Sequence, residues 1–197
     1  MTKVATWNVN SIRPRLQHVH DWLIYSQCDV LLLQELKCEE TAFPRMEIEE
    51  LGYNIALVGQ KTYNGVAILS KFPIEDILTA LPGDDSDAQA RYIEAVICAP
   101  DPVRVASIYV PNGNEVGSEK WAYKMAFYDR LYAHAQSLLA LDEAVILGAD
   151  YNVAPYPADV YDAAKLDGTV CYHADERAKL RALMHLGYYD AWRALNP

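Results

Sequence analysis

Seven apolar runs of strand length recur along the chain and are rich in Val, Ile and Tyr, which favour β-strands. The runs are Val4–Val9, Val30–Leu33, Tyr53–Val58, Val66–Leu69, Tyr92–Cys98, Val103–Val110 and Ala144–Leu147. Each is bounded by polar or turn-forming residues. The pattern therefore predicts at least seven strands.

Three other segments repeat their apolar residues with a helical period. Arg13–Gln27 places its leucine, valine and isoleucine residues on one stripe, which predicts an amphipathic helix. Glu119–Leu141 predicts a long helix, with Ser118 as its N-cap. Asp175–Leu186 has the same period, and Gly187 is placed to end it.

The middle of the chain lacks helical patterns. Four predicted strands follow one another between Tyr53 and Val110, with turn residues at Asn64-Gly65 and at 99–102. Strands linked by helices at both ends and by hairpins in the middle predict an α/β fold, a layered sandwich with mixed sheets. A purely parallel, doubly wound sheet fits this order poorly. No repeat or linker divides the chain, so we expect a single domain over residues 1–197.

Polar side chains follow four of the predicted strands. They are Asn8 and Asn10, Glu35, Tyr109 with Asn112, and Asp150 with Asn152. Ligands of α/β proteins bind at the carboxyl ends of strands, so we expect these groups to meet at one edge. Hard oxygen ligands without His or Cys suit Mg²⁺ or Mn²⁺. The pattern indicates metal-assisted hydrolysis of a phosphoester.

Each of these residues also has a simple structural interpretation. Glu35 alone is a solvated strand end, and the asparagines alone are turn formers. Tyr109 alone is a half-buried strand aromatic, and Asp150 with Asn152 caps the next turn. The functional interpretation depends on one chemical type recurring at four strand ends. Phosphate-binding glycine loops, a nucleophilic serine elbow and histidine pairs with metal spacing are absent from the sequence.

The net charge and the cysteine spacing bear on the binding partners and the cellular location of the protein. The 197 residues include 17 Lys or Arg and 27 Asp or Glu, giving a net charge of −10. A chain this acidic does not coat nucleic acid indiscriminately, but a metal and a local basic rim permit nucleic-acid binding. The four cysteines lie far apart, without zinc or redox spacing. We expect reduced thiols, a cytoplasmic location and no membrane segment.

Five motifs in one order carry a family resemblance. They are ATWNVNSIRPR at 5–15, LLLQELK at 31–37, YNGVAILSK at 63–71, SIYVPNG at 107–113 and LGADYNVAP at 147–155. Together they resemble the exonuclease III family of apurinic/apyrimidinic endonucleases, over essentially the whole chain. The resemblance implies a four-layer α/β sandwich with two packed mixed sheets. It further implies Mg²⁺-dependent cleavage, with Mn²⁺ as a substitute, of double-stranded DNA at abasic sites and 3′ ends by a monomer.

The same resemblance assigns roles to residues. Glu35 becomes the metal carboxylate with Asn8 beside it, Tyr109 a phenol that approaches the phosphate, and Asp150 the base or water-orienting group. Asn152 holds the phosphate, and both Asp150 and Asn152 join the metal set. The expected substrate-binding residues are Asn10, Asn112, Lys61, Arg91 and Lys120. Lys124 lies in a segment that faces DNA in relatives, and Arg13, Arg15 and Lys37 complete the expected basic rim.

Two departures from the family pattern matter. Ala149 stands where relatives commonly have Gly, which adds strain if the backbone there has positive φ. Relatives also continue to an Asp-His pair that contributes a main catalytic histidine, whereas this sequence stops at Pro197. We therefore expect an incomplete family member whose rate is reduced by a factor on the order of 10²–10⁴. Two alternatives remain open: another phosphoesterase of the same superfamily, or an inactive fragment that binds DNA or a partner.

Overall fold

A computed structural model describes residues 1–196 and divides the chain into two compact units. The first unit comprises Met1–Tyr109 and Glu143–Asp150. The second comprises Val110–Asp142 and Tyr151–Pro197, of which the last residue lies outside the description. The expectation of one domain over residues 1–197 stays a prediction, and the units are described separately.

Two mixed four-stranded sheets form the first unit. One has the order β1-β2-β4-β3 and the other β5-β6-β7-β8. The strands are β1 Val4–Asn8, β2 Val30–Gln34, β3 Asn54–Val58, β4 Val66–Ser70, β5 Ile74–Leu78, β6 Tyr92–Ile97, β7 Val103–Tyr109 and β8 Val145–Asp150. β1 and β2 run parallel, as do β7 and β8, and the other pairs are antiparallel.

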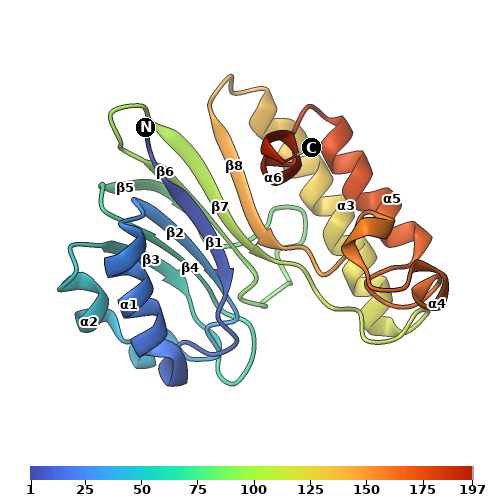
Figure 1. The fold of residues 1–197 in the computed structure, drawn as a ribbon, viewed down its shortest axis with the longest axis horizontal. Helices are drawn as coiled ribbons and strands as arrows, with labels where there is room; N and C mark the ends of the chain where they lie inside the picture. The colour runs from blue at the N-terminus through green and yellow to red at the C-terminus, as the bar shows by residue number, and fades with distance from the viewer. Residues whose placement is uncertain (197) are drawn as a thin grey trace. The chain divides into compact units, whose positions relative to one another are not determined.

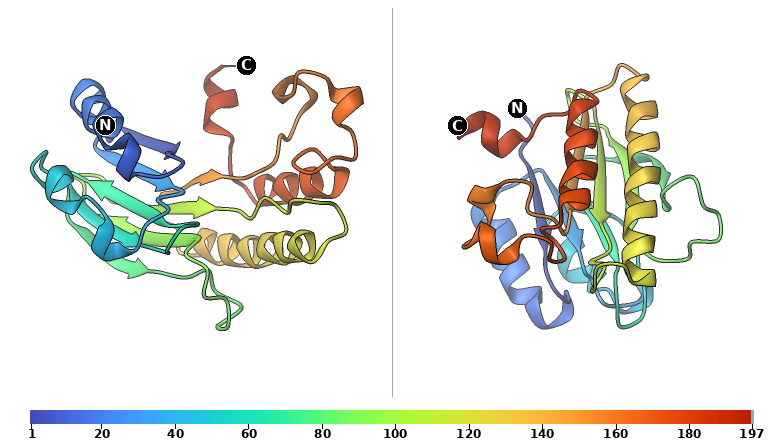
Figure 2. Two further views of the ribbon diagram at one scale, coloured as in Figure 1. Left: turned by 90° about the horizontal axis from the view of Figure 1, so that it is seen from below. Right: turned by 90° about the vertical axis from the view of Figure 1, so that its right-hand side faces the viewer.

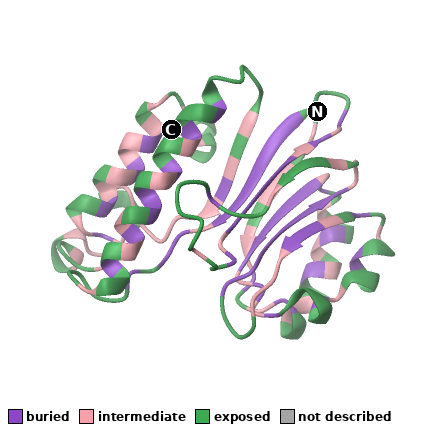
Figure 3. Ribbon diagram, turned by 180° about the vertical axis from the view of Figure 1, so that it is seen from behind, coloured by how far each residue is buried: buried purple, intermediate pink, exposed green. Residues whose placement is uncertain are grey.

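Alternating strand residues build two apolar cores in this unit. One lies between the sheets, where Leu32 and Ile68 meet Ile93 and Val105. The other lies on the far face of the first sheet, where Leu31 and its neighbours pack against helices (Figure 1). These helices are α1 Leu16–Ser26 and α2 Arg45–Glu49, with short 3-10 turns at Arg13–Arg15 and Glu40–Ala42. The two central strands of the first sheet, β2 and β4, are buried along their whole length (Figure 3).

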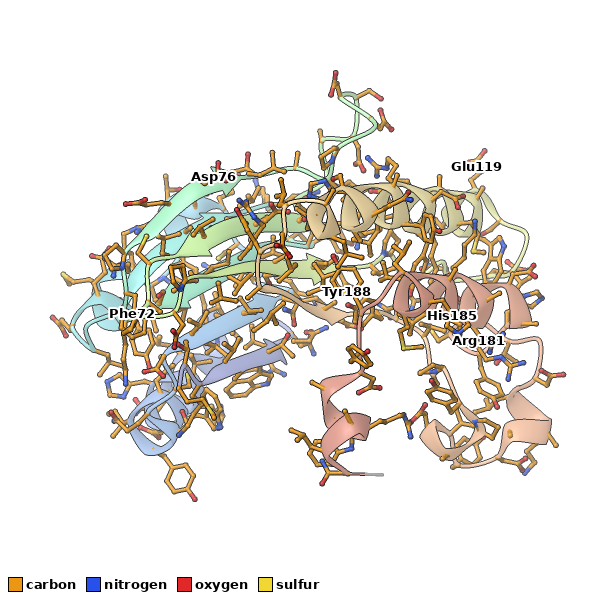
Figure 4. All side chains as sticks on the ribbon, turned by 90° about the horizontal axis from the view of Figure 1, so that it is seen from above. Phe72, Asp76, Glu119, Arg181, His185 and Tyr188 are labelled. Atoms are coloured by element: carbon orange, nitrogen blue, oxygen red, sulfur yellow. The ribbon has the colours of Figure 1, made fainter. Side chains whose placement is uncertain are left out.

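The second unit is helical. It holds α3 Glu119–Leu139, α4 Ala163–Leu166, α5 Ala174–His185, α6 Ala191–Leu195 and a 3-10 turn at Pro157–Asp159. Helices α3 and α5 pack side by side (Figure 2). The Ser118 hydroxyl accepts the Trp121 N–H at 3.2 Å and caps α3. The Tyr188 hydroxyl, labelled in Figure 4, donates to the Ala135 carbonyl at 2.9 Å and fastens the segment after α5 to α3.

The structure confirms the predicted fold class, an α/β fold with two packed mixed sheets. All seven predicted strands and all three predicted helices form, with ends that coincide or differ by at most three residues. The short helices α2, α4 and α6 were not predicted. None of the helices in the described chain is long and apolar enough to cross a membrane.

One expected strain is absent. Ala149 lies inside β8 and does not have a positive φ, so an alanine is accommodated there without a left-handed backbone. Its neighbour Gly148 is the residue that packing requires. A Cβ on Gly148 would lie 2.4 Å from Leu32 Cδ1 and 3.3 Å from Thr6 Cβ, because β8 passes close to the first sheet at this point.

Candidate active site

The ends of two parallel strand pairs bring four of the predicted site residues together in the first unit. Asn8 ends β1, Glu35 follows β2, and Tyr109 and Asp150 end the paired strands β7 and β8. The Asn8 amide nitrogen donates to Glu35 Oε1 at 2.7 Å and to Asp150 Oδ2 at 2.7 Å. Asn8 therefore links both carboxylates, and with them the edges of the two sheets.

The Asn8 amide has one consistent orientation. Its Oδ1 accepts the backbone N–H of Asn10 at 2.9 Å, while its amino group faces the two carboxylates. Carboxylates only accept and a backbone N–H only donates, so this assignment satisfies every group. Asn8 as it lies presents hydrogen-bond donors to the site. An oxygen contact from Asn8 to a metal would require the amide to turn over.

The backbone at Glu35 is left-handed, with φ of 56°. Such a conformation costs a non-glycine residue on the order of 1 kcal/mol, and in proteins it clusters at functional sites. Hydrogen bonds from both sides hold it: the Ser11 N–H donates to the Glu35 carbonyl at 2.7 Å, and the Leu36 N–H donates to the Gly65 carbonyl at 3.1 Å. The turn thus points the Glu35 carboxylate at Asn8 rather than along the strand.

Charge and hydrogen bonding stabilise Glu35 as a carboxylate. Burial alone would raise its pKa, but hydrogen bonds from Asn8, Lys37 and Tyr109 and the charge of Lys37 outweigh burial and lower it. Lys37 Nζ lies 2.7 Å from Glu35 Oε2 and also donates to Asn10 Oδ1. The site therefore holds an anion that is already partly neutralised by an ammonium group.

Tyr109 is the phenol of this cluster. Burial, the nearby negative charge of Glu35 and a hydrogen bond to Glu35 raise the Tyr109 pKa to about 12. The hydroxyl accordingly remains protonated near neutral pH and donates to Glu35. The guanidinium of Arg91 lies over the Tyr109 ring, 4.7 Å from its centre, and Nη1 donates to the Tyr109 carbonyl at 3.3 Å.

A buried polar contact between the sheets supports the cluster from behind. The Gln34 side chain, which is almost fully buried, donates from Nε2 to Ser107 Oγ at 3.0 Å and to Thr6 Oγ1 at 3.1 Å. Ser107 Oγ in turn donates to the Leu33 carbonyl at 2.8 Å. These contacts tie β1, β2 and β7 together one residue before Glu35.

The second unit holds the other two strand-end asparagines. Asn112 Nδ2 donates to Asn152 Oδ1 at 3.1 Å and lies 3.4 Å from Cys171 Sγ. Asn152 Nδ2 donates to the Val110 carbonyl at 2.9 Å. Asn152 and Cys171 both have positive φ, of 48° and 66°. Both amides are thus fixed by a network inside this unit.

The predicted basic residues differ in their surroundings. Lys61, in the loop between β3 and β4, and Lys120, in the first turn of α3, are exposed, as the prediction of substrate contact requires. Arg91 is half-buried against Tyr109. Arg15 donates to the Asn10 carbonyl at 2.7 Å, so together with Lys37 it braces the site.

The expectation for Lys124 was wrong. Its side chain is fully buried and pairs with Glu176, so it does not belong to an exposed basic rim. The sequence carried a signal for this placement. Lys124 shares the helical stripe of Trp121, Tyr128 and Leu131, all of which are buried. A lysine on an apolar stripe requires an acidic partner inside the protein.

The carboxylate pair fits a hard divalent cation. Among residues 1–196, no three His, Cys, Asp or Glu side chains gather as a metal site. Glu35 and Asp150 nevertheless face one amide nitrogen, and Mg²⁺ needs only one or two carboxylates when substrate phosphate and water complete its shell. Glu35 and Asp150 are the residues we expect to hold it.

Comparisons with known proteins identify relatives of the chain. A family model described as the Endonuclease/Exonuclease/phosphatase family matches residues 5–195. Exodeoxyribonuclease III of Haemophilus influenzae is 30% identical, over 99% of this chain and 76% of its own length. An AP endonuclease structure from Archaeoglobus fulgidus is 37% identical with a TM-score of 0.92, over 98% of this chain and 74% of that one. A 3′ phosphatase from Neisseria, solved with a product DNA hairpin, is 34% identical with a TM-score of 0.90. The match covers 95% of this chain and 72% of that one.

Proposed function

The chain belongs to the endonuclease/exonuclease/phosphatase family, and from that premise we propose that it is a metal-dependent DNA-repair phosphodiesterase. The proposed reactions are cleavage of duplex DNA at abasic sites and trimming of 3′ ends. The observation that carries the proposal is the bridge from Asn8 to Glu35 and Asp150 at the ends of three strands. The names of the matched nucleases and the DNA bound to the Neisseria neighbour support the substrate class.

Each residue of the first unit takes a role that follows from its contacts. Glu35, kept ionised by Asn8, Lys37 and Tyr109, is the proposed cation carboxylate. Asp150 is the proposed base or water-orienting group for attack on phosphorus. The Tyr109 hydroxyl stays protonated, and its single O–H would turn from Glu35 to a phosphate oxygen when substrate is bound. When bound, Mg²⁺ or Mn²⁺ would neutralise charge that develops on the phosphate.

Several other residues are proposed to act on the substrate rather than on the reacting bond. Asn112 and Asn152 would donate amide hydrogens to phosphate oxygens, and Asn10 would contact the strand near the site. Lys61 and Lys120 are exposed cations suited to the DNA backbone. A monomer bound to one duplex and a cytoplasmic location complete the proposal.

Nicking of a labelled duplex with one abasic analogue tests the proposed substrate. We expect Mg²⁺-dependent cleavage beside the analogue, loss of cleavage in EDTA and little release of phosphate from small phosphate esters. Faster release from small esters than from the duplex would instead assign the chain to a phosphoesterase of the same family with small substrates. Duplex binding without any cleavage would favour a non-enzymatic binding role.

A further inference from the structure

A buried ion pair in the second unit has no part in the proposed chemistry. Lys124 of α3 and Glu176 of α5 form a salt bridge, and both side chains are fully buried. Buried ion pairs contribute little net stability, because desolvation offsets the attraction between the charges. Replacing such a pair by well-packed apolar residues of similar volume is often neutral or stabilising. The pair therefore needs an explanation other than holding the two helices together.

The ammonium group of Lys124 reaches beyond its partner. Besides Glu176 Oε1, Nζ donates to the carbonyl oxygens of Asn112 at 3.0 Å and Asn152 at 2.6 Å. An ammonium has three donors, and these three oxygens lie nearer to Nζ than its fourth contact, Cys171 Sγ at 4.0 Å. A leucine or methionine at this position would leave both carbonyls without this donor. Lys124 thus fixes the backbone of Asn112 and Asn152 through hydrogen bonds to their carbonyl oxygens, which an apolar side chain could not form.

Glu176 also forms hydrogen bonds with a third loop, which contains Cys171 and His173. Its Oε1 accepts the Cys171 N–H at 3.1 Å, and its Oε2 accepts the His173 N–H at 3.0 Å as part of the α5 capping box. The Ala154 N–H donates to the Cys171 carbonyl at 2.8 Å, which joins this loop to the one that carries Asn152. One buried charge pair therefore fixes three irregular segments to two helices.

The segments held in this way need external support. Asn152 and Cys171 have left-handed backbones, each at a cost on the order of 1 kcal/mol, and Gly113 has φ of 89°. A Cβ on Gly113 would lie 3.1 Å from Lys124 Cδ, so the lysine stem passes directly under this loop. Such conformations persist only where surrounding contacts over-determine them.

We propose that Lys124, with Glu176 as its counter-ion, is a positioning residue that sets the mutual geometry of the Asn112 and Asn152 amides. The inference rests on the proposed function, in which these two amides bind the substrate phosphate. Lys124 acts through their backbone and has no contact with substrate. Misplacement of such groups by about 1 Å lowers a rate by about 10²-fold.

The test compares Lys124→Met with Arg104→Met. Arg104 is the control because it is also a buried cation, lies in the first unit, and pairs with Asp76, Glu94 and Glu143. Each variant is examined for Tm, for kcat and KM on the abasic duplex, and for the side-chain amide ¹⁵N resonances of its asparagines. Glu176→Gln, which keeps the shape of the carboxylate, is the second variant if Lys124→Met does not fold.

We expect Lys124→Met to lower kcat by about 10²-fold, with KM changed by less than about threefold. The amide signals of Asn112 and Asn152 should shift, while those of Asn8 and Asn10 stay in place. Arg104→Met should lower Tm and leave kcat unchanged. The inference would be overturned if Lys124→Met and Arg104→Met had the same kcat at the same folded fraction. It would also be overturned if the amide resonances of Asn112 and Asn152 did not shift in Lys124→Met. If the wild-type protein does not cut DNA, the proposed function fails. The positioning role of Lys124 is then tested only by whether the Asn112 and Asn152 amide resonances shift in Lys124→Met.

Discussion

At the scale of single residues, Glu35 shows how the site combines strain with charge. Its left-handed backbone aims the carboxylate at Asn8, and Lys37, whose φ is also positive, returns an ammonium to the same carboxylate. Both conformations are held by backbone hydrogen bonds to Asn64 and Gly65. The surrounding loops thus hold Glu35 and Lys37 in strained backbone conformations. These conformations keep the Glu35 carboxylate, which is partly buried, next to the groups that stabilise its charge.

The lowered pKa of Glu35 predicts a specific dependence of stability on pH. A carboxyl group whose folded pKa lies below its ordinary value of 4.5 contributes stability above that value. This contribution disappears as the pH falls through the folded pKa. We expect Glu35→Gln to lower Tm near neutral pH and to flatten the loss of Tm between about pH 5 and pH 3.

Circular dichroism at a series of pH values measures this effect. Glu49→Gln is the matched control, because Glu49 forms an exposed pair with Arg45 on α2. Parallel Tm curves for the wild-type protein and Glu35→Gln would show that the proposed contacts do not stabilise the ionised form of Glu35.

At the scale of elements, the strands were predictable because their apolar runs are long and end sharply. β5 was missed for a physical reason. It is an edge strand whose residues include Glu75 and Asp76, its register shifts between Glu75 and Leu78, and Asp76 has a positive φ. Such a strand buries little and carries no clear alternation. Its pairing to β6 depends on tertiary context that the sequence pattern does not contain.

The chemistry at strand ends was predictable in part. The convergence of Asn8, Glu35, Tyr109 and Asp150 follows from four apolar strands that each lead into a polar residue. The placement of Lys37 on Glu35 and of Arg91 on Tyr109 did not follow, because a charged residue near a site can face either solvent or a partner. The same ambiguity produced the wrong expectation for Lys124.

Gly148 allows β8 to approach the first sheet, which predicts an effect of adding a single methyl group. In Gly148→Ala the new Cβ would meet the side chain of Leu32, which is buried between the sheets, and that of Thr6. We expect a loss of about 1–3 kcal/mol in the free energy of unfolding, because overpacking forces neighbouring side chains from their positions. Chemical denaturation of the wild-type protein and Gly148→Ala measures this difference in the free energy of unfolding.

Ala149→Gly is the control for this substitution, since it alters the adjacent strand position without adding atoms. Its expected cost is below about 1 kcal/mol. A Gly148→Ala protein as stable as the wild-type protein would show that the sheets separate easily at this point.

At the scale of the whole molecule, the net charge of −10 opposes binding to DNA at long range. In the proposed function, local cations and a bound metal therefore have to supply the attraction to DNA. The exposed Lys61 and Lys120 are the residues of the described chain that we expect to neutralise backbone phosphates. Each phosphate contact adds about one to the slope of log affinity against log salt concentration.

Lys61→Ala should consequently weaken binding to the abasic duplex and reduce this salt slope by about one. Fluorescence anisotropy between about 50 and 200 mM salt, in Ca²⁺ to prevent cleavage, provides the slope. Lys165→Ala is the control, because Lys165 is an exposed lysine of α4 that pairs with Asp162. An unchanged slope in Lys61→Ala would remove Lys61 from the DNA contacts.

The decisive measurement is the rate at which wild-type protein and Asp150→Asn nick a duplex containing one abasic analogue in Mg²⁺. Asn preserves the shape of Asp150 and removes its charge and basicity. Asp21→Asn, on the exposed surface of α1, controls for the loss of one negative charge. We expect wild-type protein and Asp21→Asn to nick at the same rate and Asp150→Asn to be slower by about 10²–10³-fold. Equal nicking by Asp150→Asn and wild-type protein, or no nicking by either, would contradict a hydrolytic site at Asn8, Glu35 and Asp150.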